Sequence, residues 1–110
     1  MTLSTHVLDT ARGAPAAGIA IALFALDGPE RTLLGRSITN ADGRTNAPLA
    51  DDLPAGSYEI VFAAGAYFSE RGIAAFYDEI PVRFAIGVNG GHYHVPLLLA
   101  PWSYSTYRGS

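Results

Sequence analysis

Residues 92–110 read HYHVPLLLAPWSYSTYRGS and predict two strands, His92–Leu99 and Ser103–Arg108, with a turn at Pro101 between them. Successive side chains of a strand point to opposite faces, so a period of two sorts them. This alternation predicts a strand that covers a core with one face and presents imidazoles on the other. The core face carries Tyr93, Val95, Leu97 and Leu99, and the second face carries His92, His94, Pro96 and Leu98.

Similar short apolar runs recur along the chain, and turn-forming residues separate them; the sequence contains 12 glycines and 7 prolines. Seven or eight short strands at this spacing predict a β-sandwich. The pattern breaks after Gly65, where Ala66–Gly72 predicts one or two helical turns ended by Gly72. The other expected strands are Leu3–Thr10, Ile19–Leu26, Arg31–Ile38, Ser57–Ala63 and Ile80–Ile86, with a short eighth piece near Thr45–Pro48 and a turn at Gly13–Pro15.

Length and composition limit the class of protein. At 110 residues we expect a single domain over residues 1–110. Charged residues make up 15% of the chain, against about 25% in a typical protein, which suggests that other copies of the chain cover part of the surface. The net charge of −3 without a basic cluster argues against nucleic acid as a partner. The sequence has no apolar run of about 18 residues, so we expect no membrane span.

The sequence contains no cysteine, which excludes disulfides and thiol chemistry and fits a reducing compartment. The first residues lack the basic and apolar segments of a secretory signal. We therefore expect a cytoplasmic protein.

All three histidines fall on strand faces that are half polar. In the first strand Ser4, His6 and Leu8 share one face, opposite Thr5, Val7 and Asp9; in the last, Ser103, Ser105 and Tyr107 lie together. Histidine, with an unperturbed pKa of about 6.5, suits a proton shuttle at neutral pH. His92, at the start of its strand, is expected only to orient its neighbours.

The same residues also suit other chemistries. His-x-His on a strand face can chelate zinc, with His6 as a possible third ligand. Because cysteine is absent and the nearest acid, Asp9, lies on the face opposite His6, we expect no native metal. Arg44, after the turn Asn40–Gly43, is either a solvated surface group or a fixed guanidinium for an anionic or enol-like oxygen. No Gly-x-Ser-x-Gly elbow is present, and the spacing does not support a catalytic triad with Asp9.

The segments that carry these residues resemble the motifs of the 5-hydroxyisourate hydrolases, the transthyretin-related enzymes of urate breakdown. They are STHVLD at residues 4–9, TNADGR at 39–44, and HYHVPLLL at 92–99 followed by SYSTYRGS at 103–110. The match covers essentially the whole chain, and its Tyr-Arg-Gly-Ser ending is the most specific part. Transthyretin, the hormone carrier of the same fold, lacks this ending and lacks the matching two histidines and arginine.

The resemblance implies an all-β, transthyretin-like sandwich of two four-stranded sheets with one short helix. It also implies a homotetramer, a dimer of dimers, with active sites in the channel between the dimers. The implied reaction is hydrolysis of 5-hydroxyisourate to 2-oxo-4-hydroxy-4-carboxy-5-ureidoimidazoline in urate degradation, a part of purine metabolism. That reaction requires no cofactor.

The resemblance also implies roles for individual residues. The expected catalytic residues are His6, Arg44, His94 and Ser110; the expected substrate-binding residues are His6, Arg44, Leu98, Ser105, Tyr107, Arg108 and Gly109. The histidines would share water activation and proton return, and Arg44 would stabilise oxyanion charge. The tail would close the pocket, with Gly109 giving the backbone freedom to turn. Which histidine is the general base stays open.

Two other functions remain possible from the sequence. A transthyretin-like carrier would hold a small aromatic ligand in the same channel, and a purely structural sandwich would bind a protein partner. A carrier does not need His6, Arg44, His94 or the tail, whereas the hydrolase does.

Overall fold

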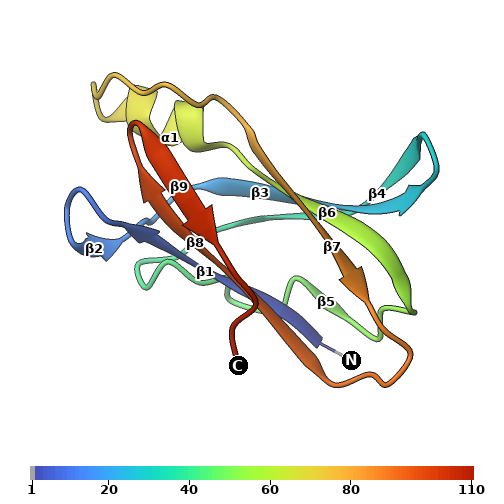
Figure 1. The fold of residues 1–110 in the computed structure, drawn as a ribbon. Helices are drawn as coiled ribbons and strands as arrows, with labels where there is room; N and C mark the ends of the chain where they lie inside the picture. Colours follow the sequence, from blue (N-terminus) through green and yellow to red (C-terminus); the bar gives the residue numbers. More distant parts are fainter. Residues whose placement is uncertain (1) are drawn as a thin grey trace.

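The computed structural model describes residues 2–110 as two facing β-sheets with one short helix (Figure 1). One sheet has the order β2-β1-β8-β9, with β5 also paired to β1, and the other has the order β4-β3-β6-β7. The all-β class with a short helix is confirmed; the first sheet gains a fifth strand because two-residue β5 joins it. The elements are β1 Thr2–Asp9, β2 Ala14–Pro15, β3 Ala20–Asp27, β4 Glu30–Ile38, β5 Ala50–Asp51, β6 Gly56–Phe62, α1 Ala64–Glu70, β7 Ile80–Ile86, β8 His92–Ala100 and β9 Ser103–Thr106.

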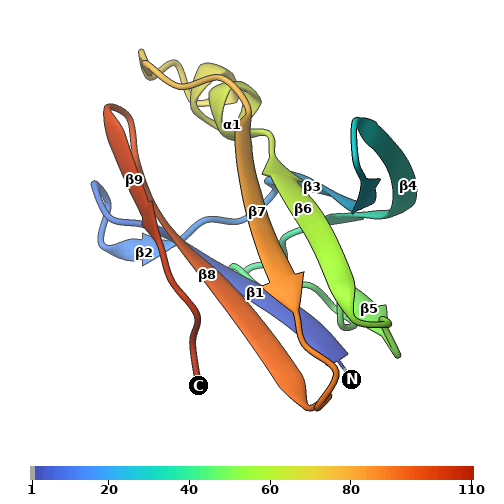
Figure 2. The ribbon, with the colours of Figure 1, turned by 45° about the vertical axis from the view of Figure 1, so that its right-hand side comes forward.

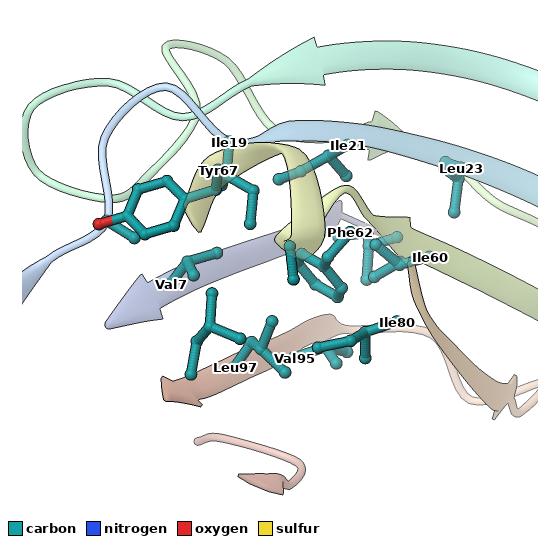
Figure 3. Close-up of a cluster of buried hydrophobic side chains, with 14 of the residues drawn as sticks. Val7, Ile19, Ile21, Leu23, Ile60, Phe62, Tyr67, Ile80, Val95 and Leu97 are labelled. Atoms are coloured by element: carbon teal, nitrogen blue, oxygen red, sulfur yellow. The ribbon is translucent and has the colours of Figure 1, made fainter. Parts of the chain in front are cut away.

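The core lies between the sheets. Burial alternates residue by residue along β1, as the period of two predicts. Figure 3 shows Val7 and Leu97 of the first sheet facing Ile60 and Phe62 of the second, and all four side chains are fully buried. Each such side chain contributes about 1.5–3 kcal/mol by leaving water. The apolar faces thus hold the two sheets together, and the outer faces are left for other roles (Figure 2).

The first and last long strands of the chain lie side by side. β1 pairs in parallel with β8, with Ser4 opposite His94 and His6 opposite Pro96. Every other strand pair within residues 2–110 is antiparallel. The parallel pair puts the polar faces of β1 and β8 next to each other.

Some boundaries differ from the sequence prediction. The prediction of a strand near Thr45–Pro48 is wrong. The Thr45 hydroxyl donates a hydrogen bond within a turn, and Ala50–Asp51 pairs with β1 instead. Ala14–Pro15 forms β2 against the end of β1 and not a turn. Helix α1 begins at Ala64 and ends at Glu70, and Gly72 follows it with a φ of 68°.

Strand β9 ends at Thr106 and not at Arg108, because it meets a proline. Pairing runs from Ala100 opposite Ser103 to Leu97 opposite Thr106. The next position of β8 is Pro96, which has no N–H to donate to the ladder. The Thr106 hydroxyl donates to the Pro96 carbonyl at 2.7 Å instead. The chain then rejoins β8 where Gly109 bridges His94, which keeps the register of the hairpin.

Helix α1 is fastened to the end of β1 by a buried carboxylate. Tyr67 of α1 donates its hydroxyl to Asp9 Oδ2 at 2.8 Å, and the Arg12 backbone N–H donates to Asp9 Oδ1 at 3.2 Å. Burial, followed by the hydrogen bond to Asp9, raises the pKa of the Tyr67 hydroxyl. Both carboxylate oxygens of Asp9 therefore accept hydrogen bonds within the fold. No helix among residues 2–110 is long and apolar enough to cross a membrane.

A second buried carboxylate lies on the outer side of the second sheet. Glu59 is 2% exposed and accepts from Arg31 at 2.7 Å and from Arg83 at 2.8 Å. The Arg83 hydrogen bond is the largest cause that lowers the Glu59 pKa; Arg31 adds to it, and burial opposes both. The ion pairs thus join β4, β6 and β7 across the sheet.

We predict that Glu59→Gln lowers the free energy of unfolding by about 1–2 kcal/mol at pH 7, because the partly exposed arginines lose their anionic partner. A lowered pKa in the folded state means that the carboxylate stabilises the fold above its ordinary pKa of 4.5, and that this is lost as the pH falls through the lowered pKa. The difference in the free energy of unfolding between wild type and Glu59→Gln should therefore become smaller below pH 4.5.

Urea unfolding at one fixed protein concentration measures both values, and Glu30→Gln, at an exposed carboxylate, is the control. A difference that stays constant between pH 7 and about pH 3 would contradict the assigned cause.

Candidate functional site

The outer face of the first sheet gathers the polar residues that the period of two had separated. The parallel register of β1 and β8 places Ser4 beside His94, and the β8–β9 hairpin places Leu98 beside Ser105. The three half-polar strand faces are therefore one continuous surface. It carries Thr2, Ser4, His6 and Leu8 from β1, His92, His94, Pro96 and Leu98 from β8, and Ser103 and Ser105 from β9.

His6 projects from β1 toward the loop that follows β4. Its Nε2 lies 2.9 Å from the Asp42 carbonyl oxygen. A carbonyl oxygen can only accept, so Nε2 carries the proton of this hydrogen bond. In the neutral ring, the free lone pair is then on Nδ1.

The loop that carries Arg44 is held against β1 by its own turn chemistry. Asn40 Oδ1 accepts from the backbone N–H groups of Asp42 and Arg44, at 2.9 and 3.2 Å. Gly43 has a φ of +73°, and its carbonyl accepts from the Val7 N–H at 2.8 Å. A Cβ at Gly43 would lie 2.3 Å from the Val7 carbonyl oxygen, so only glycine fits. This close approach brings exposed Arg44 to the histidine face.

His94 lies at the centre of this group of charges. Burial is the largest cause that lowers its pKa below 6.5, and positive charge on Arg44, His92 and His6 lowers it further. The structure thus brings together His6, Arg44 and His94, as the sequence predicted. A lowered pKa keeps the His94 imidazole neutral at pH 7, which is the state that accepts a proton.

Ser4 lies between two imidazoles. Its Oγ is 2.8 Å from His94 Nδ1 and 3.0 Å from His92 Nε2, and the two rings stack with centroids 6.2 Å apart. Among residues 2–110, none forms a hydrogen bond with His94 Nε2. The predicted site residues do not include Ser4 and His92. The sequence signal for them was that His92 shares a strand face with His94 and Ser4 shares one with His6, whereas the pairing of the two strands comes from the structure.

The C-terminal tail docks on His94. The Gly109 N–H donates to the His94 carbonyl at 2.8 Å, and a Cβ on Gly109 would lie 2.7 Å from His94 Cδ2. Gly109 is not among the glycines with positive φ. Glycine is needed here because the tail backbone packs directly on the imidazole, and not for the freedom to turn that the sequence suggested.

Other predicted site residues are placed less centrally. The Arg108 guanidinium lies 4.3 Å from the centroid of the Tyr93 ring, and Tyr93 belongs to the inward face of β8. Tyr107 is 56% exposed, and together with Arg108 it borders a hollow of about 260 Å³ between β7 and β8. Ser110 is exposed at the end of the docked tail.

The histidine face is open. His6 and His94 are half-buried, and His92 is exposed. Hollows of about 540 and 670 Å³ lie elsewhere, beside β3–β4 and beside α1. Within residues 2–110, no three His, Cys, Asp or Glu side chains are arranged to hold a metal ion. The arrangement presents a neutral base, a second imidazole and a guanidinium to one point, which suits hydrolysis of a polarised carbonyl.

Comparisons with known proteins show the family to which the chain belongs. The family model described as HIUase/Transthyretin matches residues 3–109. The chain is 51% identical to the 5-hydroxyisourate hydrolase of Deinococcus radiodurans, over 98% of this chain and 95% of that protein. Its fold matches the structure of Klebsiella pneumoniae 5-hydroxyisourate hydrolase at 40% identity and a TM-score of 0.88, with both chains fully covered.

The same fold also occurs in a hormone-binding protein. Sea bream transthyretin, solved in complex with thyroxine, superposes with a TM-score of 0.92 at 28% identity, over 99% of this chain and 95% of that one. The expectation of a transthyretin-like sandwich is therefore confirmed. Because the family model covers nearly the whole chain and a relative of similar length shares half of its residues, the chain belongs to the HIUase/Transthyretin family.

Proposed function

We infer that this chain hydrolyses 5-hydroxyisourate to 2-oxo-4-hydroxy-4-carboxy-5-ureidoimidazoline in urate degradation. The observation that carries the inference is the meeting of His6, Arg44 and His94 on one sheet face, beside the docked tail. The relatives named 5-hydroxyisourate hydrolase support the same substrate. The reaction needs a base for water, a positive group for the carbonyl oxygen and a proton for the leaving nitrogen, and these side chains supply all three.

In the proposed mechanism, His94 takes the proton of the attacking water at its free Nε2. His6 orients that water through Nδ1, since its Nε2 is occupied by the Asp42 carbonyl. Arg44 pairs with the carbonyl oxygen as it becomes an oxyanion. His94 then returns the proton to the leaving ring nitrogen, and no cofactor or metal is required.

The tail closes this site. Gly109 holds the tail on His94, and we propose that Ser110, the next residue, reaches the reacting groups, with Leu98 and Ser105 farther along the same face. Arg108, stacked on Tyr93, anchors the segment, and Tyr107 is available to cover the substrate. We propose that Leu98, Ser105 and Tyr107–Gly109 bind the substrate together with His6 and Arg44.

We further propose that the enzyme is a homotetramer and works in the cytoplasm. The histidine face is open in the single chain, so a second face is needed to make a channel. Exposed apolar side chains and the low charge content support the covering of this surface by other copies. The absence of cysteine suits a reducing compartment.

The fold alone also suits a carrier of a small aromatic ligand, as in the thyroxine complex of sea bream transthyretin. A carrier does not use a neutral imidazole placed beside a guanidinium. The catalytic group on the face therefore favours the hydrolase.

The direct test generates 5-hydroxyisourate from urate with urate oxidase and follows the decay of its absorbance with and without this protein. We expect the protein to accelerate the decay strongly over the spontaneous rate. His6→Asn and His94→Asn should each lose most of this acceleration, since both side chains touch the reacting water. Decay at the spontaneous rate in the presence of the wild-type protein would remove the hydrolase assignment.

The pH dependence tests the charges around His94. The base must be neutral, and its lowered pKa should place the acid limb of kcat/KM below pH 6.5. Arg44→Gln removes a positive charge, so it should raise the His94 pKa and move that limb upward, besides slowing turnover by about a hundredfold. Arg36→Gln, at an exposed arginine on β4, is the matched control. An acid limb that does not move in Arg44→Gln would refute the coupling.

The tail is tested by removal. Deletion of Tyr107–Ser110 should cost on the order of a hundredfold in kcat/KM, about 3 kcal/mol of transition-state stabilisation, because the site loses its cover. Thermal melting and light scattering should show the fold and the tetramer unchanged in the truncated chain. A tag after Ser110 should impair turnover, whereas a tag before Met1 should not.

Gly109→Ala tests the same tail with a single methyl group. Its Cβ would press on the His94 ring, whereas a Cβ at Gly35 would meet nothing within 4 Å, so Gly35→Ala is the control. Full turnover in the truncated form would show that the tail has no role in catalysis. A monomer in light scattering would contradict the proposed tetramer.

A further inference from the structure

A chain of hydrogen bonds extends behind the proposed base, on the side away from its free nitrogen. His94 Nδ1 lies 2.8 Å from Ser4 Oγ, and Ser4 Oγ lies 3.0 Å from His92 Nε2. His92 Nδ1 lies 2.5 Å from Thr2 Oγ1. Both ring nitrogens of His92 are therefore used, and the chain runs from a half-buried imidazole to an exposed one.

The register of the sheet builds this chain. β1 and β8 pair in parallel with Thr2 opposite His92 and Ser4 opposite His94, so hydroxyls and imidazoles face one another in two successive pairs. The planes of the two stacked rings differ by only 17°. The Ser4 hydroxyl lies within hydrogen-bond distance of one nitrogen of each ring.

The Ser4 hydroxyl has one proton, and this couples the tautomers of the two rings. If His94 presents a lone pair at Nε2, its Nδ1–H donates to Ser4, and the hydroxyl proton of Ser4 is then available to donate to His92 Nε2. His92 then carries its proton on Nδ1 and donates to Thr2. In the opposite arrangement every donor is reversed, and His94 carries its proton on Nε2. In both arrangements the Ser4 hydroxyl links the tautomers of His92 and His94.

The surroundings of the two rings favour different charges. His94 faces Arg44 from the loop, His6 from β1 and His92 from its own strand. Its burial lowers its pKa most, and the charge of Arg44 and repulsion from protonated His92 or His6 lower it further. Gly109 of the tail packs on the ring and adds no side-chain charge. His92 is exposed, so water can solvate a positive charge there.

We propose that Ser4 and His92 form a proton relay for His94, in which the positive charge created by water deprotonation moves to His92. This proposal rests on the hydrolase function above. As a water proton binds His94 Nε2, the Nδ1 proton of His94 passes to Ser4 Oγ, and the hydroxyl proton of Ser4 passes to His92 Nε2. Three bonds to hydrogen form and three break, counting the O–H bond of the water. His94 and Ser4 end neutral, and His92 ends as an imidazolium. The reverse transfer supplies the proton for the leaving nitrogen.

The test compares Ser4→Ala, Ser4→Thr and His92→Gln. Ser4→Ala breaks the relay, whereas His92→Gln keeps an amide that can hydrogen-bond to Ser4 but cannot take up a proton. We expect both variants to lose about 10–100-fold in kcat with little change in KM, and the double variant to lose no more than the single ones. Ser4→Thr retains the hydroxyl and should recover most of the turnover. Ser57→Ala, at an exposed serine on the other sheet, is the matched control.

Two readouts separate a relay from simple positioning. The rate in mixtures of H2O and D2O should depend non-linearly on the deuterium fraction in the wild type, because several protons move together, and linearly in both relay variants. Nitrogen-15 NMR of the imidazoles should show the His94 proton on Nδ1 in the wild type and shifted toward Nε2 in Ser4→Ala. The NMR measurement requires no turnover, so it tests the tautomers of the imidazoles even if the protein does not hydrolyse 5-hydroxyisourate.

His92→Gln with wild-type kcat would overturn the relay and leave His92 only a positioning role. A wild-type His94 that carries its proton on Nε2 would overturn it as well. A protein inactive on 5-hydroxyisourate with the expected tautomers would instead refute the proposed function alone.

Discussion

The parallel pairing of β1 with β8 is the contact on which the rest of the site depends. It places His6 and Ser4 from the start of the chain beside His94 from its end, at a separation of one strand. The same register lets alternate residues fill the core from the opposite face. A shift by one residue would turn the histidines into the core and the leucines outward. Burial of the inner face therefore fixes the position of the proposed catalytic groups on the outer one.

One proline and two glycines bring the tail and Arg44 close to the histidines. Pro96 interrupts the ladder between β8 and the tail, and Gly109 restores it at His94. Gly43 lets the loop touch the backbone of β1, so that Arg44 reaches the same place. Each of these positions uses a backbone property, a missing donor or a missing Cβ, to bring a functional group close. The cost in regular pairing is confined to the edge of one sheet.

The electrostatic character of the site follows from this crowding. Positive groups gather around His94, and the two buried carboxylates described above are occupied elsewhere, Asp9 by Tyr67 and Glu59 by its arginines. The lowered pKa of His94 favours its neutral form, and in the proposed mechanism the positive charge of Arg44 serves a developing oxyanion. The same sandwich occurs in a transthyretin solved in complex with thyroxine, so the fold alone does not specify the activity.

The sequence by itself determined the class of fold and the inward faces of the long strands, because alternation and turn residues are local properties. The resemblance of its motifs to a family pointed to His6, Arg44 and His94, which stay the proposed catalytic residues. It misplaced the strand near Thr45–Pro48, since pairing of so short a segment depends on its partner. Only the tertiary structure decided that β1 and β8 pair in parallel, and hence that Ser4 joins two imidazoles. Strand order and register arise from packing between segments some ninety residues apart, which no local pattern encodes.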